Sequence, residues 1–148
     1  MKRLFKGGTI VGAGASQQAD LLVCNDKIVL IGKDLASSDA EVVDVRGRLL
    51  FPGFIDAHTH FDLDVCNTTT ADDFETGSAA AVCGGTTMVI DFACPNKGET
   101  LGYGLSLWHK KAGGRTSCDY GFHMTIDDWN EGIRAEIPQM FEAGLSSF

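Results

Sequence analysis

The feature that most constrains the fold is an alternation of β-rich and helical segments that begins after Gly53. Residues 53–58 and 86–93 are apolar β-rich runs, and a stretch with helical character follows each of them. Residues 118–125 form a third β-rich run before a third helical stretch, and residues 145–148 begin a fourth. Strands and helices that alternate in this way are typical of a parallel sheet with crossover helices, so we predict an α/β fold.

Capping and breaking residues predict the helix boundaries. Asp72 can cap the first helix with Glu75 as its capping-box partner. Gly84 and Gly85 permit a left-handed end to the same helix. Pro138 interrupts the apolar pattern of the third helix, which predicts either a kink there or two short helices.

Residues 1–52 follow a different pattern, in which short β-rich runs are broken by turn residues. Asn25 and Asp26 separate two of these runs and predict a tight hairpin. We expect a small antiparallel β module that needs further strands to complete a stable sandwich. The sequence therefore predicts two domains, 1–52 and 53–148.

Composition excludes several classes of protein. The net charge is -8 and no cationic cluster is present, which argues against a nucleic-acid partner. No window holds the roughly 18 apolar residues of a membrane helix, and the N-terminus lacks the apolar core of a signal peptide. The five cysteines form no C-x-x-C pair, so free thiols are expected. We predict a soluble cytoplasmic protein that does not contact membranes.

Two of the four histidines, His58 and His60, lie at the end of the first β-rich run after Gly53. Residues i and i+2 of a strand project from the same face, so Asp56 shares that face with both. Two converging imidazoles can hold one divalent metal ion, and Asp56 can orient one of them through its other ring nitrogen. An apolar strand has no packing reason to end in two polar rings. We therefore predict that His58 and His60 are metal ligands.

Four segments of the chain carry a resemblance to a known family. Together they resemble the dihydropyrimidinase and D-hydantoinase branch of the amidohydrolase superfamily, and the phenylhydantoinase-like members in particular. The segments are residues 43–60, 70–92, 118–126 and 136–148. The resemblance implies a (β/α)8 TIM-type barrel, of which residues 53–148 supply the first three to four βα units, and a β-sandwich begun by residues 1–52.

The resemblance also implies a cofactor. The family binds two divalent metal ions, usually Zn2+, bridged by a hydroxide and by a carbamylated lysine. His58 and His60 match the first two metal ligands, and the remaining ligands fall later in the barrel. The lysine would follow directly after Phe148, so we expect an N-terminal segment of a longer protein that is inactive by itself.

The implied activity is hydrolysis of a small cyclic amide or ureide by a homotetrameric enzyme of pyrimidine catabolism. Attack of the metal-bridging hydroxide would open a hydantoin or 5,6-dihydropyrimidine ring to an N-carbamoyl amino acid. The loop after the histidine pair departs from many hydantoinases, and Leu63, Val65 and Cys66 are candidates to line the pocket for the ring substituent. For Leu63 and Val65, burial in the loop's own core is an equal alternative.

Two other functions remain open from the sequence. The first is another cyclic amidohydrolase, such as an allantoinase or a dihydroorotase, which would share the histidine pair. The second is a non-catalytic scaffold on the same fold, like the collapsin-response relatives that have lost metal ligands.

Overall fold

The computed structural model describes residues 1–148, which divide into two compact units, Met1–Pro52 and Gly53–Phe148. Each unit has its own sheet. No helix in the structure combines the length and the apolar character that a membrane span requires.

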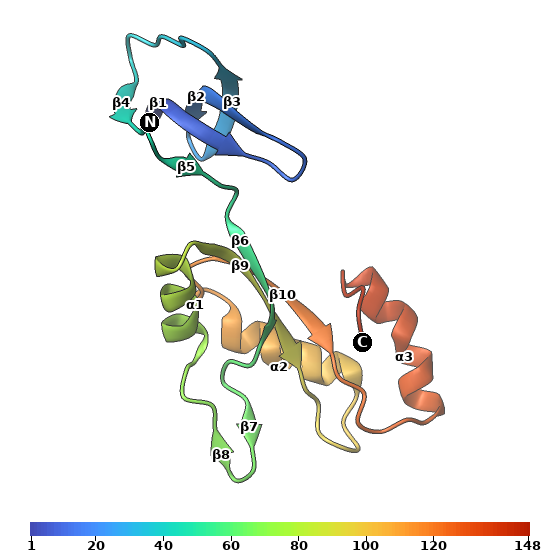
Figure 1. Ribbon diagram of the computed structural model, residues 1–148. Helices are drawn as coiled ribbons and strands as arrows, with labels where there is room; N and C mark the ends of the chain where they lie inside the picture. The colour runs from blue at the N-terminus through green and yellow to red at the C-terminus, as the bar shows by residue number, and fades with distance from the viewer. The chain divides into compact units, whose positions relative to one another are not determined.

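The first unit is a five-stranded sheet with the order β3-β2-β1-β4, in which β5 also pairs with β1 (Figure 1). Its strands are β1 (Lys2–Val11), β2 (Ser16–Cys24), β3 (Lys27–Gly32), β4 (Glu41–Asp44) and β5 (Leu49–Leu50). The predicted hairpin is confirmed, because Asn25 and Asp26 join β2 to β3 with φ angles of 46° and 66°.

The expectation of a purely antiparallel module is wrong. β1, β2 and β3 pair antiparallel, but β4 and β5 both pair parallel to β1. The segment 33–40 carries the chain from β3 at one edge to the far side of β1, so β4 runs in the same direction as β1. Sequence patterns identify strands, whereas this pairing depends on the path of the loop.

A buried carboxylate accepts backbone hydrogen bonds within this sheet. Asp20 is 5% exposed and accepts hydrogen bonds from the backbone N–H groups of Gly7 (2.8 Å) and Leu35 (2.9 Å). Gly7 has a φ of +76° at the irregularity in the β1–β2 pairing. Asp20 therefore satisfies an N–H group that the interrupted ladder leaves without a strand partner.

The second unit has a three-stranded sheet in the order β10-β9-β6, and both pairings are parallel (Figure 1). The strands are β6 (Phe54–Thr59), β9 (Thr86–Ala93) and β10 (Asp119–Met124), and the helices are α1 (Phe74–Cys83), α2 (Leu101–Ala112) and α3 (Glu131–Glu142). The predicted α/β alternation is confirmed. A small hairpin of β7 (Asp64–Val65) and β8 (Thr68–Thr69) lies between β6 and α1.

The helix boundaries differ from expectation in two places. The N-cap of α1 is Asp73, which accepts a hydrogen bond from Thr76 N–H at 2.8 Å, so the predicted Asp72–Glu75 box is one residue too early. α3 continues through Pro138 as one helix, which excludes two short helices, and the alternative of a kink at Pro138 stays a prediction. The predicted fourth strand is absent at residues 145–148, although Met124 N–H donates to the Ser147 carbonyl at 3.2 Å beside β10.

The core of the second unit lies between the sheet and its helices. Phe74 of α1 is fully buried and meets the rings of Phe61 and Phe122 edge-on, at 5.6 and 6.3 Å between centroids. α2 contributes the largest share of the cluster, namely Leu101, Leu105, Trp108 and Ala112. This packing fixes the helices against the sheet, whose carboxyl edge carries the histidine pair.

Candidate metal-binding site

The two predicted ligands face each other at the carboxyl end of β6. His58 lies in the strand and His60 immediately follows it, and their Nε2 atoms are 3.2 Å apart. Two imidazole nitrogens that each bind a zinc ion at about 2.0–2.1 Å would be about 3.0 Å apart at a right angle and about 3.4 Å apart at a tetrahedral angle. The observed separation falls between these values. The geometry of the pair therefore fits two ligands of one metal ion.

An aromatic ring supports both imidazoles. The centroid of Phe92 lies 4.7 Å from that of His58 and 5.0 Å from that of His60, and the two histidine rings are nearly perpendicular to each other. His123 of β10 packs on the same phenyl ring at 4.7 Å. Phe92 thus restricts the positions that the two imidazoles can occupy.

The pairing of β6 with β9 is irregular at the histidines. The register shifts between Asp56 and Thr59, so Ala57 and His58 are outside the regular ladder. His123 Nε2 lies 2.9 Å from the Ala57 carbonyl oxygen, and its Nδ1 contacts the hydroxyl of Ser147. Since the carbonyl can only accept, Nε2 of His123 carries a proton and donates it to the Ala57 carbonyl. A side chain of β10 therefore satisfies the carbonyl that the irregularity frees.

Asp91 of β9 is a further polar residue at this site, and the sequence analysis did not identify it. It is fully buried and accepts hydrogen bonds from Thr59 Oγ1 (2.8 Å), Phe61 N–H (2.8 Å) and Trp108 Nε1–H (3.0 Å). Burial raises its pKa and outweighs these hydrogen bonds, which act to lower it. The available signal was an aspartate inside the apolar run 86–93, since an acidic residue there requires dedicated partners.

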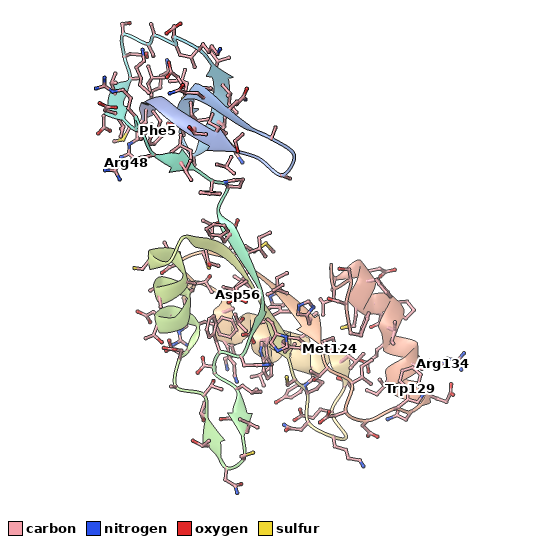
Figure 2. All side chains as sticks on the ribbon, viewed as in Figure 1. Phe5, Arg48, Asp56, Met124, Trp129 and Arg134 are labelled. Atoms are coloured by element: carbon pink, nitrogen blue, oxygen red, sulfur yellow. The ribbon has the colours of Figure 1, made fainter.

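Asp56 lies on β6 (Figure 2), and its carboxylate has a backbone N–H group as its partner. Its Oδ1 accepts a hydrogen bond from the N–H of His58 at 3.2 Å. This contact fixes the main chain at His58 and does not involve an imidazole nitrogen. The proposed orientation of a ring by Asp56 stays a prediction.

The three candidate pocket residues lie in different surroundings. Leu63 is half-buried against the core, and its N–H donates to Thr70 Oγ1 at 3.0 Å. Val65 is 46% exposed, and it lines a cavity of about 280 Å3 together with Leu63 and residues that follow β9 and β10. Cys66 is an exposed free thiol at the tip of the β7–β8 hairpin, with a φ of 52°. The structure brings Leu63 and Val65 together, and it places Cys66 at the turn.

The second unit offers two converging nitrogen ligands and no more. No group of three or more histidine, cysteine, aspartate or glutamate side chains is arranged to hold a metal ion. Zinc sites in proteins take three or four protein ligands, so a zinc site here requires further ligands besides His58 and His60.

Comparison with known proteins shows what the chain is similar to. Residues 49–104, which include β6 and both histidines, match the model of the amidohydrolase family. The chain is 47% identical to the D-hydantoinase of Geobacillus stearothermophilus, over all of this chain and 32% of that protein. It is 40% identical to the dihydropyrimidinase of Dictyostelium discoideum, over 98% of this chain and 29% of that protein.

A solved structure agrees with these sequence matches. The dihydropyrimidinase of Brevibacillus agri NCHU1002 superimposes with a TM-score of 0.94 and 43% identity, over 99% of this chain and 32% of that one. The predicted resemblance to the amidohydrolases is confirmed. Within that group the chain resembles the D-hydantoinases and dihydropyrimidinases, and it spans about a third of the length of the relatives it matches.

Proposed function

We propose that this chain is part of a metal-dependent cyclic amide hydrolase, which opens hydantoin or 5,6-dihydropyrimidine rings to N-carbamoyl amino acids. The observation that carries the proposal is the 3.2 Å separation of the His58 and His60 Nε2 atoms at the carboxyl end of a parallel strand. Active sites of parallel α/β barrels lie at this end of the sheet. The class of substrate is taken from the similar proteins, which are a D-hydantoinase and two dihydropyrimidinases.

The site fits a metal ion by its donor set and its spacing. We propose two divalent ions, most simply Zn2+, with a carbamylated lysine as a further ligand outside this chain. When bound, the metals supply a hydroxide at neutral pH and polarise the carbonyl of the ring.

The other residues of the site hold this pair in place. Phe92 packs against both imidazoles, and the Asp56 carboxylate fixes the N–H of His58. The cavity lined by Leu63 and Val65 opens at the same end of the sheet and is a candidate contact for the ring substituent. We retain Cys66 as a weaker candidate, because it lies exposed at the hairpin tip and does not line this cavity.

The two units have separate roles in this proposal. Gly53–Phe148 would be the first three to four βα units of a (β/α)8 barrel, and Met1–Pro52 would begin a β-sandwich completed by other strands. The residues of β3 from Ile28 to Ile31 are apolar and exposed, and β3 is an edge strand of its sheet. Open apolar edges are rarely left uncovered in proteins, which supports the proposal that further strands pack against this sheet. We propose a homotetramer as the assembly of the whole enzyme.

The test uses the full-length protein. Wild type, His58→Ala and His60→Ala are compared for bound metal and for turnover of hydantoin, dihydrouracil, allantoin and dihydroorotate. His109→Ala is the matched control, because His109 is an exposed histidine on α2 outside the site. We expect both site variants to lose metal and activity and the control to keep them.

The outcomes separate the alternatives. Turnover of allantoin or dihydroorotate in preference to the first two substrates would indicate another cyclic amidohydrolase. Absence of both metal and turnover in the wild type would indicate a non-catalytic scaffold. Equal metal content in wild type and His60→Ala would contradict the assignment of the ligands.

A further inference from the structure

Asp91 connects three elements of the second unit through one carboxylate. Its Oδ2 accepts from Thr59 Oγ1 and from Phe61 N–H, both at 2.8 Å, and its Oδ1 accepts from Trp108 Nε1–H at 3.0 Å. Thr59 and Phe61 are the residues on either side of His60. The two hydrogen bonds at Oδ2 therefore bracket one of the two candidate ligands.

Backbone pairing does not fix His60. The β6–β9 ladder shifts register between Asp56 and Thr59, and β6 ends at Thr59. Beyond that point the N–H of Phe61 has the Asp91 carboxylate as its acceptor instead of a strand partner. The Asp91 side chain thus accepts the hydrogen bond that a backbone carbonyl of the neighbouring strand accepts elsewhere in the sheet.

The surroundings of Asp91 make this attachment rigid. Asp91 is fully buried, Trp108 is 3% exposed and Thr59 is 9% exposed, so water does not compete for the three hydrogen bonds. Phe92, the next residue of β9, packs on the ring of His60 with 5.0 Å between centroids. Consecutive residues of β9 therefore hold the main chain around His60 and the imidazole itself.

Burial of a carboxylate is a costly way to stabilise a fold. Burial disfavours the charged form of an ionisable group. Replacing buried charged groups with apolar residues of similar size often leaves a protein equally stable. What the carboxylate adds here is geometry, since one oxygen accepts from two donors that are two residues apart in the chain. That arrangement fixes both the position and the direction of the segment that carries His60.

We propose that Asp91 is a positioning residue, which holds His60 opposite His58 in the orientation that binds a metal ion. The inference rests on the proposed metal site and adds to it a residue that contacts neither the metal ion nor an imidazole. Residues that orient metal ligands typically affect metal affinity by roughly 10–100-fold.

The test is the affinity of the full-length apoprotein for Zn2+ alone, measured by competition with a chromophoric chelator. Asp91→Asn keeps one oxygen acceptor but replaces the other with a donor, so it cannot satisfy Thr59, Phe61 and Trp108 together. Thr59→Val removes one of the two donors at Oδ2 with little change of shape. We expect Asp91→Asn to raise the Kd for Zn2+ roughly 10–100-fold and Thr59→Val to raise it less.

Ser78→Ala is the matched control for a loss of stability. Ser78 is fully buried on α1, and its hydroxyl accepts from Ser117 N–H at 2.8 Å and donates to carbonyls of α1, so its hydrogen bonds lie outside β6. All proteins are assayed at a temperature where near-ultraviolet circular dichroism shows them folded. A positioning role predicts weaker metal binding in Asp91→Asn and Thr59→Val and unchanged binding in Ser78→Ala, even if all three lower the thermal midpoint.

Two results would overturn the inference in distinguishable ways. If Asp91→Asn binds Zn2+ as tightly as wild type while His60→Ala does not, the metal site stands and Asp91 has only a structural role. If His60→Ala also binds as tightly as wild type, the metal site itself is wrongly assigned. Equal weakening in Ser78→Ala and Asp91→Asn would also refute the positioning role, because general destabilisation would then explain both.

Discussion

Gly77 provides a sharp test of how firmly the segment after His60 is packed. Gly77 is buried in α1, and a Cβ at this position would lie 2.3 Å from Cε1 of Phe61. Ordinary contacts begin at about 3.4 Å, so the ring would have to retreat by about 1 Å. Phe61 cannot do so freely, because its ring packs edge-on against Phe74 and its N–H is bonded to Asp91.

The expected magnitude follows from two opposing effects. Overpacking of a core typically costs about 1–3 kcal/mol, and we expect the upper part of this range because two aromatic rings must move. Alanine in place of glycine stabilises a helix by up to about 1 kcal/mol. Gly77→Ala should therefore lower the free energy of unfolding by about 1–2 kcal/mol.

Gly102 of α2 is the matched control. Its added Cβ would meet nothing closer than Glu136 Oε2 at 3.8 Å, so Gly102→Ala should stabilise the protein by up to about 1 kcal/mol. The assay is urea or thermal unfolding of the full-length protein with each change. A second copy of the experiment in a Phe61→Ala background removes the obstacle, and there Gly77→Ala should become neutral or stabilising.

The reasoning would be refuted if Gly77→Ala were as stable as Gly102→Ala in the wild-type background. It would also be refuted if the loss persisted in the Phe61→Ala background, because the steric conflict would then lie elsewhere.

Three further predictions concern single sites. Phe74→Ala should lower the free energy of unfolding, measured by urea titration, by about 3–5 kcal/mol, because Phe74 is fully buried in the aromatic cluster. A loss below about 1 kcal/mol would contradict that packing. Asn130→Ala should cost about 1 kcal/mol in the same assay, because Asn130 caps α3 by accepting from Ile133 N–H, whereas Asn130→Ser should restore most of it. Hydrogen bonds from Arg46 lower the pKa of Asp44 from 3.8 to about 2, so its stabilising effect is complete above the unfolded pKa and is lost as pH falls toward 2. Asp44→Asn should flatten this part of the acid unfolding curve, and an unchanged curve would show that the ion pair contributes nothing.

Patterns that depend on neighbouring residues in the sequence were predicted well. The strand 86–93 was bounded correctly, because its apolar run is interrupted inside only by Asp91 and glycines precede it. The turn at Asn25 and Asp26 was found because both residue types tolerate positive φ. The cap of α1 was misplaced by one residue, since two adjacent aspartates compete for the same role and only the structure shows that Thr76 bonds to Asp73.

Features that depend on distant residues could not be predicted in the same way. The parallel pairing of β4 with β1 follows from the path of a loop, which carries no periodic signal. The spacing of His58 and His60 was predictable from strand geometry, whereas the contacts of His60's neighbours with Asp91 join residues about thirty positions apart. An aspartate in a buried strand indicates that it has hydrogen-bond partners, but the sequence does not show which residues they are.

The central position of β9 has a consequence for the order in which the second unit folds. In the register of the sheet, 32 residues separate Thr59 from its partner Asp91, and a nearly equal length separates Asp91 from its partner Phe122. Closure entropy depends only weakly on loop length, so the two strand pairings face almost the same entropic barrier. During folding, β9 can therefore pair first with either β6 or β10. Two parallel routes to the same sheet would make the folding rate tolerant of a mutation that weakens only one of the pairings.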